Sequence, residues 1–183
     1  MVTLEQDPRR VALSRRAVEL LQSTIPIECR AADVAAAEAW PEQPSIVAAL
    51  HACGAAADAI IGQTIMSKAR VLLLVPCCTS NAVTAAAQAQ DVAKRLGIPS
   101  QAPVRRRFIQ AFVDAERTWR LEAAGYETEV VEFVAATVTP HNLLWRSRLV
   151  AEPKRMAAAR RAHEALARAP GGQMQGAATQ AMW

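Results

Sequence analysis

Two apolar runs, Ile46-Val-Ala-Ala-Leu50 and Val71-Leu-Leu-Leu-Val75, decide how this chain of 183 residues folds. Neither run alternates apolar with polar side chains, which is typical of strands covered on both faces of a sheet. A helical stretch at 56–69, with Ile61 and Ile65 facing inward, separates the two runs. Because a crossover of this length forces parallel pairing, we expect the two strands to be parallel neighbours in an α/β fold.

The rest of the chain continues this alternation of short strands and helices. Asp7 and Pro8 predict the start of a helix, as its N-cap and first turn, and Gly125 predicts the end of another. Further strands are expected at 2–4, 25–31, 126–134 and 143–150, and further helices after Pro8, at 103–124 and from Pro153. The apolar face of the first helix, expected to point to the core, consists of Leu13, Ala17, Leu20 and Leu21.

Length and composition favour one domain, because 183 residues with 52% hydrophobic side chains are enough for one core. No apolar run approaches the roughly 20 residues that span a bilayer. The first residues, MVTLEQDPRR, do not resemble a signal peptide. We therefore expect a cytoplasmic protein without a membrane partner, and reduced thiols at Cys29, Cys53, Cys77 and Cys78.

Basic side chains are concentrated near the C-terminus. Residues 146–168 hold seven basic and two acidic side chains, a balance of +5, which leaves 14 basic and 15 acidic side chains, or −1, elsewhere. This uneven charge gives only weak support for a nucleic-acid partner. We expect an α/β domain over 1–152, a basic helix over 153–168 and a disordered tail over 169–183.

Polar residues at the carboxyl ends of parallel strands are the first candidates for a binding site, because ligands of such sheets bind there. Glu5 ends the first strand and could accept the hydroxyls of a ribose, or be a solvated acid near a helix N-terminus. Asp33 follows the second strand and could accept the amine of an adenine, or cap the next segment.

One histidine and three cysteines follow the two apolar strands. If these strands are neighbours, the turns with His51 and Cys53 and with Cys77 and Cys78 lie side by side. The four side chains could bind zinc, although neither turn has the usual Cys-x2-Cys spacing. A reactive thiol and plain tight-turn packing are the alternatives, and packing is the simplest of the three.

The same turns resemble a known family. Val47-Ala-Ala-Leu-His-Ala-Cys-Gly54 and Val75-Pro-Cys-Cys78 are similar to class I S-adenosylmethionine-dependent methyltransferase domains of the "HACG…PCC" type. The segment Val138-Thr-Pro-His-Asn-Leu-Leu144 resembles the family's loop into its last strand. The resemblance covers about residues 2–150 and implies a Rossmann-like sheet, mostly parallel, with an antiparallel last strand.

The resemblance also implies roles for individual residues. Glu5 would bind the ribose of S-adenosylmethionine and Asp33 would border its adenine. The cofactor would also contact the turn made of His51, Ala52, Cys53 and Gly54, and the substrate pocket would include Pro76, Cys77 and Cys78. The resemblance assigns no catalytic residue.

The chain departs from the family at its start. It begins at what resembles the family's second strand, without the central first strand and its Asp-x-Gly-x-Gly-like loop. We therefore expect open edges on the strands that carry Glu5 and His51, covered by an upstream segment, by direct pairing or by a homodimer.

Three functions follow as hypotheses. The first is S-adenosylmethionine-dependent methyl transfer to an unknown substrate. The second is a catalytically inactive methyltransferase-like module that binds a protein or RNA. The third is a thiol or zinc protein built on the turns at His51–Gly54 and Pro76–Cys78.

Overall fold

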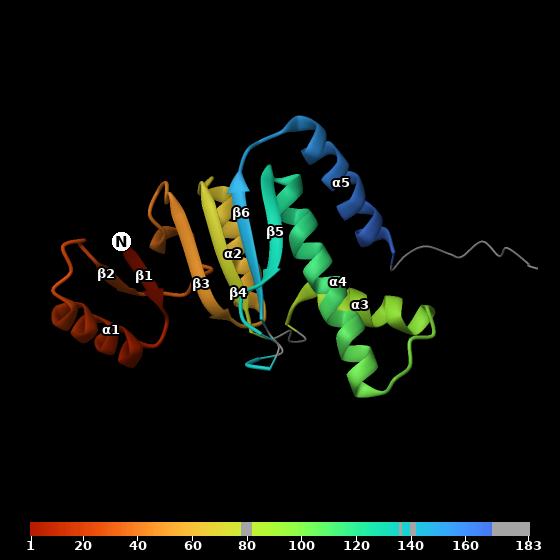
Figure 1. Cartoon of the computed structure of the whole chain (residues 1–183), viewed down its shortest axis with the longest axis horizontal. Helices are drawn as coiled ribbons and strands as arrows, with labels where there is room; N and C mark the ends of the chain where they lie inside the picture. The colour runs from red at the N-terminus through yellow and green to blue at the C-terminus, as the bar shows by residue number, and fades with distance from the viewer. Residues whose placement is uncertain (78–81, 136, 140–141, 170–183) are drawn as a thin grey trace, which may run out of the picture.

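The computed structural model describes residues 1–77, 82–135, 137–139 and 142–169 (Figure 1). The strands are β1 (Val2–Glu5), β2 (Glu28–Ala31), β3 (Ile46–Ala52), β4 (Val71–Pro76), β5 (Tyr126–Glu132) and β6 (Leu143–Leu149). The helices are α1 (Pro8–Leu21), α2 (Ala55–Met66), α3 (Thr84–Arg95), α4 (Ala102–Ala123) and α5 (Pro153–Arg168), with a short 3-10 turn, η1, at Ala37–Ala39. The α/β class predicted from the sequence is confirmed.

The strands form two separate sheets. One contains the parallel pair β1–β2, and the other has the strand order β3-β4-β6-β5. In the larger sheet β3 and β4 are parallel, as their crossover through α2 requires, whereas β6 runs antiparallel to both β4 and β5. The predicted antiparallel last strand is therefore confirmed. In the described part of the chain, no strand pairing joins β1 to β3.

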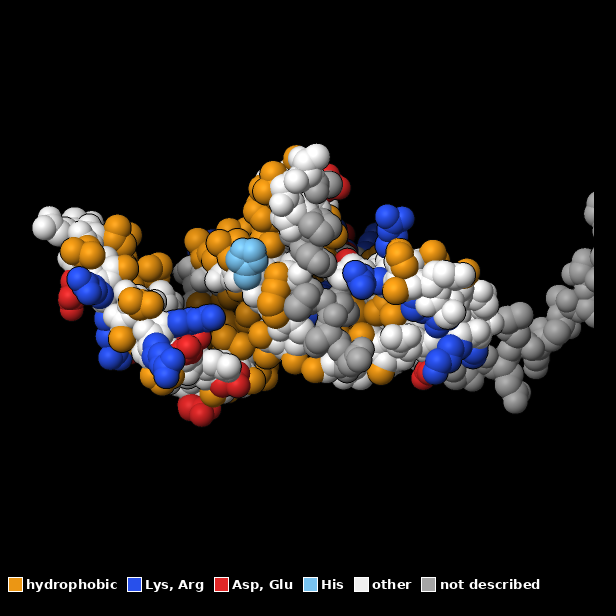
Figure 2. Space-filling view, turned by 90° about the horizontal axis from the view of Figure 1, so that it is seen from below, with side chains coloured by type: hydrophobic (Ala, Val, Ile, Leu, Met, Phe, Trp, Pro, Cys, Tyr) orange, Lys and Arg blue, Asp and Glu red, His pale blue; other side chains and the backbone are white. Residues whose placement is uncertain are grey.

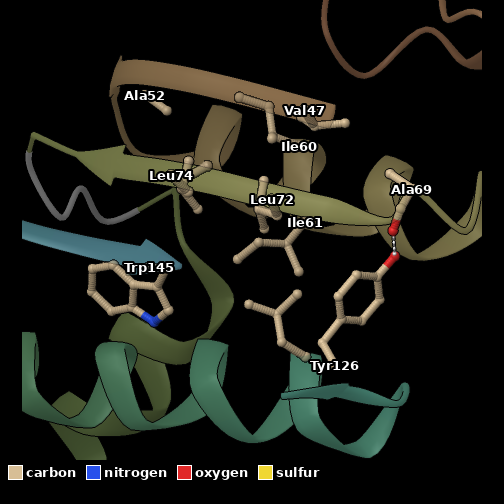
Figure 3. Close-up of a cluster of buried hydrophobic side chains, with 11 residues drawn as sticks. Val47, Ala52, Ile60, Ile61, Ala69, Leu72, Leu74, Tyr126 and Trp145 are labelled. Carbon is tan, nitrogen blue, oxygen red and sulfur yellow. Dashed lines mark hydrogen bonds between the residues drawn. The ribbon is translucent and has the colours of Figure 1, made fainter. Parts of the chain in front are cut away.

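One face of the larger sheet carries the main core. Leu72, Leu74 and Trp145 are almost fully buried there, together with Ile61 of α2 and Leu121 of α4. Figure 3 shows side chains of β3, β4, β6 and α2 meeting in this layer. The polar atoms of its aromatic residues are satisfied, as buried polar groups require.

The polar atoms of Tyr126 and Trp145 each have a hydrogen-bond partner. The hydroxyl of Tyr126 lies 2.8 Å from the carbonyl oxygen of Ala69 and 3.0 Å from that of Thr64. The Trp145 Nε1–H donates to the Thr118 hydroxyl at 3.1 Å. Burial raises the pKa of Tyr126 to about 12, so its hydroxyl keeps its proton near neutral pH.

The opposite face of the same sheet is uncovered at β3, which corrects the prediction that this strand is covered on both sides. Ile46 is 63% exposed and Leu50 is 73% exposed, whereas Val47, which points to the core, is buried. The apolar run does not reveal this difference, because the run records the hydropathy of the side chains and not whether another element packs on them.

Helix α1 shows a second departure from the predicted core. Asp7 caps the helix as expected, since its Oδ1 accepts the Arg9 N–H at 2.8 Å. The predicted inward stripe, however, is exposed at Leu13, Ala17, Leu20 and Leu21. Of α1, only Val11 is buried, on the side that faces β1 and β2. The stripe has the spacing of a buried face, but no described element covers it.

The C-terminal part of the chain packs on the main body. Gly125 ends α4 with a φ of +101°, and an added Cβ would lie 3.2 Å from the Ala151 backbone, which explains the glycine. Helix α5 then runs along α4, where Arg155 donates to Glu122 at 2.9 Å. None of the helices within the described ranges is long and apolar enough to cross a membrane. Residues 170–183, most of the predicted tail, lie outside the described residues.

Candidate functional site

The carboxyl ends of β3 and β4 lie side by side. These strands pair in register from Ile46 with Val71 to Leu50 with Val75, and the register then shifts by one residue. His51 is the extra residue, with a φ of +57°, and Ala52 becomes the partner of Pro76. This bulge places the turn after β3 directly beside the turn after β4.

A disulfide joins the two turns and corrects the expectation of reduced thiols. Cys53 and Cys77 are bonded across a sequence separation of 24, with their Cα atoms 5.4 Å apart. This Cα distance is typical both of disulfides and of residues on neighbouring strands. The expectation followed from the absence of any sign of secretion in the sequence, which does not record which cysteines lie close in space. Cys78 lies outside the described residues, and Cys29 is a free thiol.

The disulfide also bears on the zinc hypothesis. A sulfur atom in a disulfide has no thiolate charge to give to a metal ion. In the described ranges, no three His, Cys, Asp or Glu side chains are grouped as metal ligands would be. The bonded pair therefore does not favour zinc binding by the described part of these turns.

The turn at His51–Gly54 is held by a hydrogen bond from α4. The carbonyl oxygen of Gly54 accepts a hydrogen bond from Arg117 Nη2 at 3.3 Å, and the Arg117 side chain is fully buried. Arg117 Nε also donates to Asp58 Oδ1 at 2.9 Å. Ala52 is buried, whereas His51 and Cys53 are exposed at the edge of the sheet. The turn is thus held by its backbone while two of its side chains face outward.

Glu5 ends β1, as predicted, and is partly engaged by its own chain. Its Oε1 accepts the Asp7 N–H at 3.0 Å, and its Oε2 lies 3.8 Å from Arg10. The side chain is 32% exposed, so a ligand can still reach the carboxylate. Glu5 is therefore an available acceptor with one local hydrogen bond.

Asp33 follows β2 and closes the next turn. Its Oδ1 accepts the Ala35 N–H at 2.8 Å, which is the local capping role that the sequence left open. Glu5 and Asp33 lie close in space, because the Ala32 N–H donates to the Glu5 carbonyl oxygen at 3.0 Å. The two acids thus belong to the same end of the β1–β2 sheet.

The predicted site residues form two groups. Glu5 and Asp33 lie at the end of the smaller sheet, and the turns at His51–Gly54 and Pro76–Cys77 lie together at the end of the larger one. In Figure 1, β1 and β5 point toward the same edge of the molecule. Since β6 is antiparallel to both β4 and β5, strand β5 runs in the same direction as β3 and β4. Figure 2 views this edge, and shows hydrophobic side chains beside the more highly charged part that contains α1. No hydrogen-bonded strand links the two groups in the described part of the chain.

The sequence did not indicate a cavity of about 220 Å³ that opens between α2, α3, α4 and α5. Its polar lining comes from Asp58, Thr84, Gln88, Glu116, Arg120 and His163. Arg120 donates to Asp58 Oδ1 at 3.0 Å, and His163 Nε2 lies 3.2 Å from Glu116 Oε1. Only the i, i+4 spacing of Glu116 and Arg120 is visible in the sequence, because the other groups are distant along the chain.

On the same helix, α4, burial raises the pKa of Asp114 to about 6. A hydrogen bond from the Gln110 side chain, at 2.9 Å, and the positive charge of Arg117 act in the opposite direction. Desolvation of the partly buried carboxyl group is the larger effect.

Comparisons with known proteins agree with the resemblance in outline. No curated protein and no solved structure matches the chain. The match to a family model extends from β1 to the start of α3 and contains Glu5, Asp33 and both turns. Residues 1–85 are similar to the family described as a methyltransferase domain, which supports methyl transfer as the general activity of this part of the chain.

Proposed function

We propose that this chain is a cytoplasmic methyltransferase that uses S-adenosylmethionine, with a methyl acceptor still to be identified. The main support is the family match over residues 1–85, which contains both groups of candidate residues. The strand order is a second support, because the sheets separate between β1 and β3, where the resemblance places the absent central strand.

Glu5 and Asp33 are suited to the nucleoside half of this cofactor. Both carboxylates follow parallel strands, and each has one oxygen that accepts only a local backbone N–H. A ribose offers two hydroxyl donors and an adenine offers an amine, so neighbouring acids can bind both. The turn at His51–Gly54 would then line the methyl-transfer pocket, with Pro76, Cys77 and Cys78 next to it.

Bound S-adenosylmethionine would supply a methyl group that its sulfonium already activates. The protein would then have to position the acceptor and exclude water, without a pair of catalytic acids. This explains why the candidate residues are mainly binding groups.

Calorimetry with S-adenosylmethionine at millimolar concentration tests the proposal. We expect binding heat from the wild-type chain and an affinity about tenfold lower for Glu5→Gln, because hydrogen bonds to a charged group contribute about 1.5–3 kcal/mol. Glu19→Gln, on the exposed side of α1, is the matched control and should bind as the wild type does. No binding heat, or equal affinities of all three proteins, would contradict the proposal.

The inactive interaction module is the second candidate, and the exposed β3 supports it. The strand Ile46–Ala52 contains no Lys, Arg, Asp or Glu, and its exposed side chains include Ile46 and Leu50. Charges on an edge strand normally prevent pairing between copies, so this edge favours a homodimer. Two copies that meet here would bring no like charges together.

Analytical ultracentrifugation tests the homodimer. We expect a dimer for the wild-type chain and a monomer for Leu50→Lys, because a lysine on the uncovered face would oppose its counterpart. Leu13→Lys, which changes an equally exposed leucine of α1, should remain a dimer. A wild-type chain that is monomeric at high concentration would exclude the homodimer.

The basic helix α5 supports a nucleic-acid partner only weakly. Arg155 is held by Glu122 and Glu127, at 2.9 Å and 3.3 Å. Arg168 lies 3.5 Å from Glu164 on the same helix. These pairs reduce the positive charge that α5 presents to a phosphate backbone.

A further inference from the structure

The bulge at His51 determines which cysteine faces Cys53. Without the extra residue, the register that pairs Leu50 with Val75 would continue and place Cys53 opposite Cys78. With the bulge, Ala52 pairs with Pro76, so the next residues, Cys53 and Cys77, become neighbours. Residues opposite each other on parallel strands project to the same side of the sheet. The backbone therefore selects Cys77 as the partner before any bond forms.

The pair is also accessible from outside. Cys53 is exposed and Cys77 is half-buried at the carboxyl edge of the sheet. The His51 carbonyl oxygen lies 3.4 Å from Cys53 Sγ and 3.5 Å from Cys77 Sγ, so one backbone group borders both sulfur atoms. A small thiol or disulfide can thus approach Cys53 without opening the core.

We propose that Cys53 and Cys77 form a reversible thiol–disulfide site that exchanges with low-molecular-weight thiols and disulfides, such as glutathione. Cys53 is the entry residue, because it is the more exposed of the two. Cys77 is the resolving residue, because the bulge holds it opposite Cys53. The proposal does not rest on the proposed function, because the exchange is measured on the chain without S-adenosylmethionine.

The exchange is balanced with glutathione as the second reactant. In oxidation, the Cys53 thiolate attacks glutathione disulfide, forms a mixed disulfide and releases one glutathione thiolate. The Cys77 thiolate then attacks Cys53 Sγ and releases the second glutathione thiolate. Two electrons pass from the protein to glutathione disulfide, and the two protons of the cysteines end on two glutathione molecules. Reduction follows the same steps in reverse.

The core of the larger sheet is independent of this bond. Leu72, Leu74 and Trp145 are buried together with side chains of α2 and α4, and neither Cys53 nor Cys77 belongs to this core cluster. We therefore expect the reduced chain to stay folded. The bond closes a loop that contains all of α2, and closing a loop of this size should raise Tm by about 5–10 °C.

Mass spectrometry in glutathione buffers tests the proposal. Wild-type protein, Cys29→Ser and Cys78→Ser should lose the mass of two hydrogen atoms in oxidising buffer and regain it in reducing buffer. The double variant Cys77→Ser with Cys78→Ser should instead gain one glutathione, which peptide mapping should place on Cys53. Circular dichroism of the reduced wild-type protein verifies that the fold is retained.

Three results would overturn the proposal. The first is a wild-type chain whose cysteines all stay reduced in oxidising glutathione. The second is a bond that Cys78→Ser abolishes, which would show that the bulge does not select Cys77. The third is a reduced chain that has lost its native circular dichroism, because the bond would then be a structural requirement and not a reversible site.

Discussion

The two sheets of this molecule differ in how much of their surface is buried. The sheet β3-β4-β6-β5 has α2 and α4 on one face, with Leu72, Leu74 and Trp145 almost fully inaccessible. The sheet β1–β2 packs against α1, whose three leucines, Leu13, Leu20 and Leu21, are exposed. A two-stranded sheet is marginally stable by itself. The family match therefore begins in the part of the chain that buries the fewest apolar side chains.

Replacing one leucine by alanine in each region would test this difference most strongly. Leu72→Ala should destabilise the protein by about 3–5 kcal/mol, because it removes a fully buried side chain and leaves a cavity. Leu13→Ala, at a residue that is 67% exposed in α1, should change stability by at most about 0.5 kcal/mol. Urea unfolding of both variants measures the difference. A large loss from Leu13→Ala would show that another element or a second copy covers α1.

Asp114 should make the stability of the larger region depend on pH. Its pKa is about 6 in the folded chain, above the usual 3.8, so the protonated form favours folding. This contribution is complete below about pH 3.8 and is lost as the pH rises through about 6. Asp114→Asn should therefore be more stable than the wild type at pH 8, by up to about 3 kcal/mol, and similar to it at pH 4.

Urea unfolding at pH 4 and pH 8 measures this effect. Asp91→Asn, which changes an exposed aspartate on α3, is the control and should show no such dependence. An advantage of Asp114→Asn that is equal at both pH values would contradict the burial of the carboxyl group.

A smaller effect than that of Asp114 is expected on the uncovered face of the larger sheet. There Arg146 pairs with Glu129, and both side chains are more than half exposed. Exposed ion pairs contribute about 0–1 kcal/mol, and salt screens them. Arg146→Ala should therefore change the free energy of unfolding by less than about 1 kcal/mol, and the change should shrink in 1 M salt. A larger, salt-independent loss would indicate that another surface packs on this face.

Local sequence signals located most of the fold. The Asp7 cap, the end of α4 at Gly125 and the parallel pairing of β3 with β4 were all predicted and are confirmed. Each depends on residues a few positions apart or on the length of one crossover. Predictions of burial were less successful, since the stripe of α1 and the outer side of β3 are exposed. Burial depends on what packs against an element, which hydropathy does not record.

The candidate site divides in the same way. The sequence by itself determined that Glu5, Asp33, His51 and both cysteine turns lie at or just after the ends of strands, because the apolar runs end there. Only the tertiary structure decided that Cys53 is bonded to Cys77 and that Asp58 meets Arg117 and Arg120. These contacts join residues 24 to 62 positions apart, and they depend on a one-residue bulge and on helix packing. Short-range patterns in a sequence fix neither the register of distant strands nor the approach of distant helices.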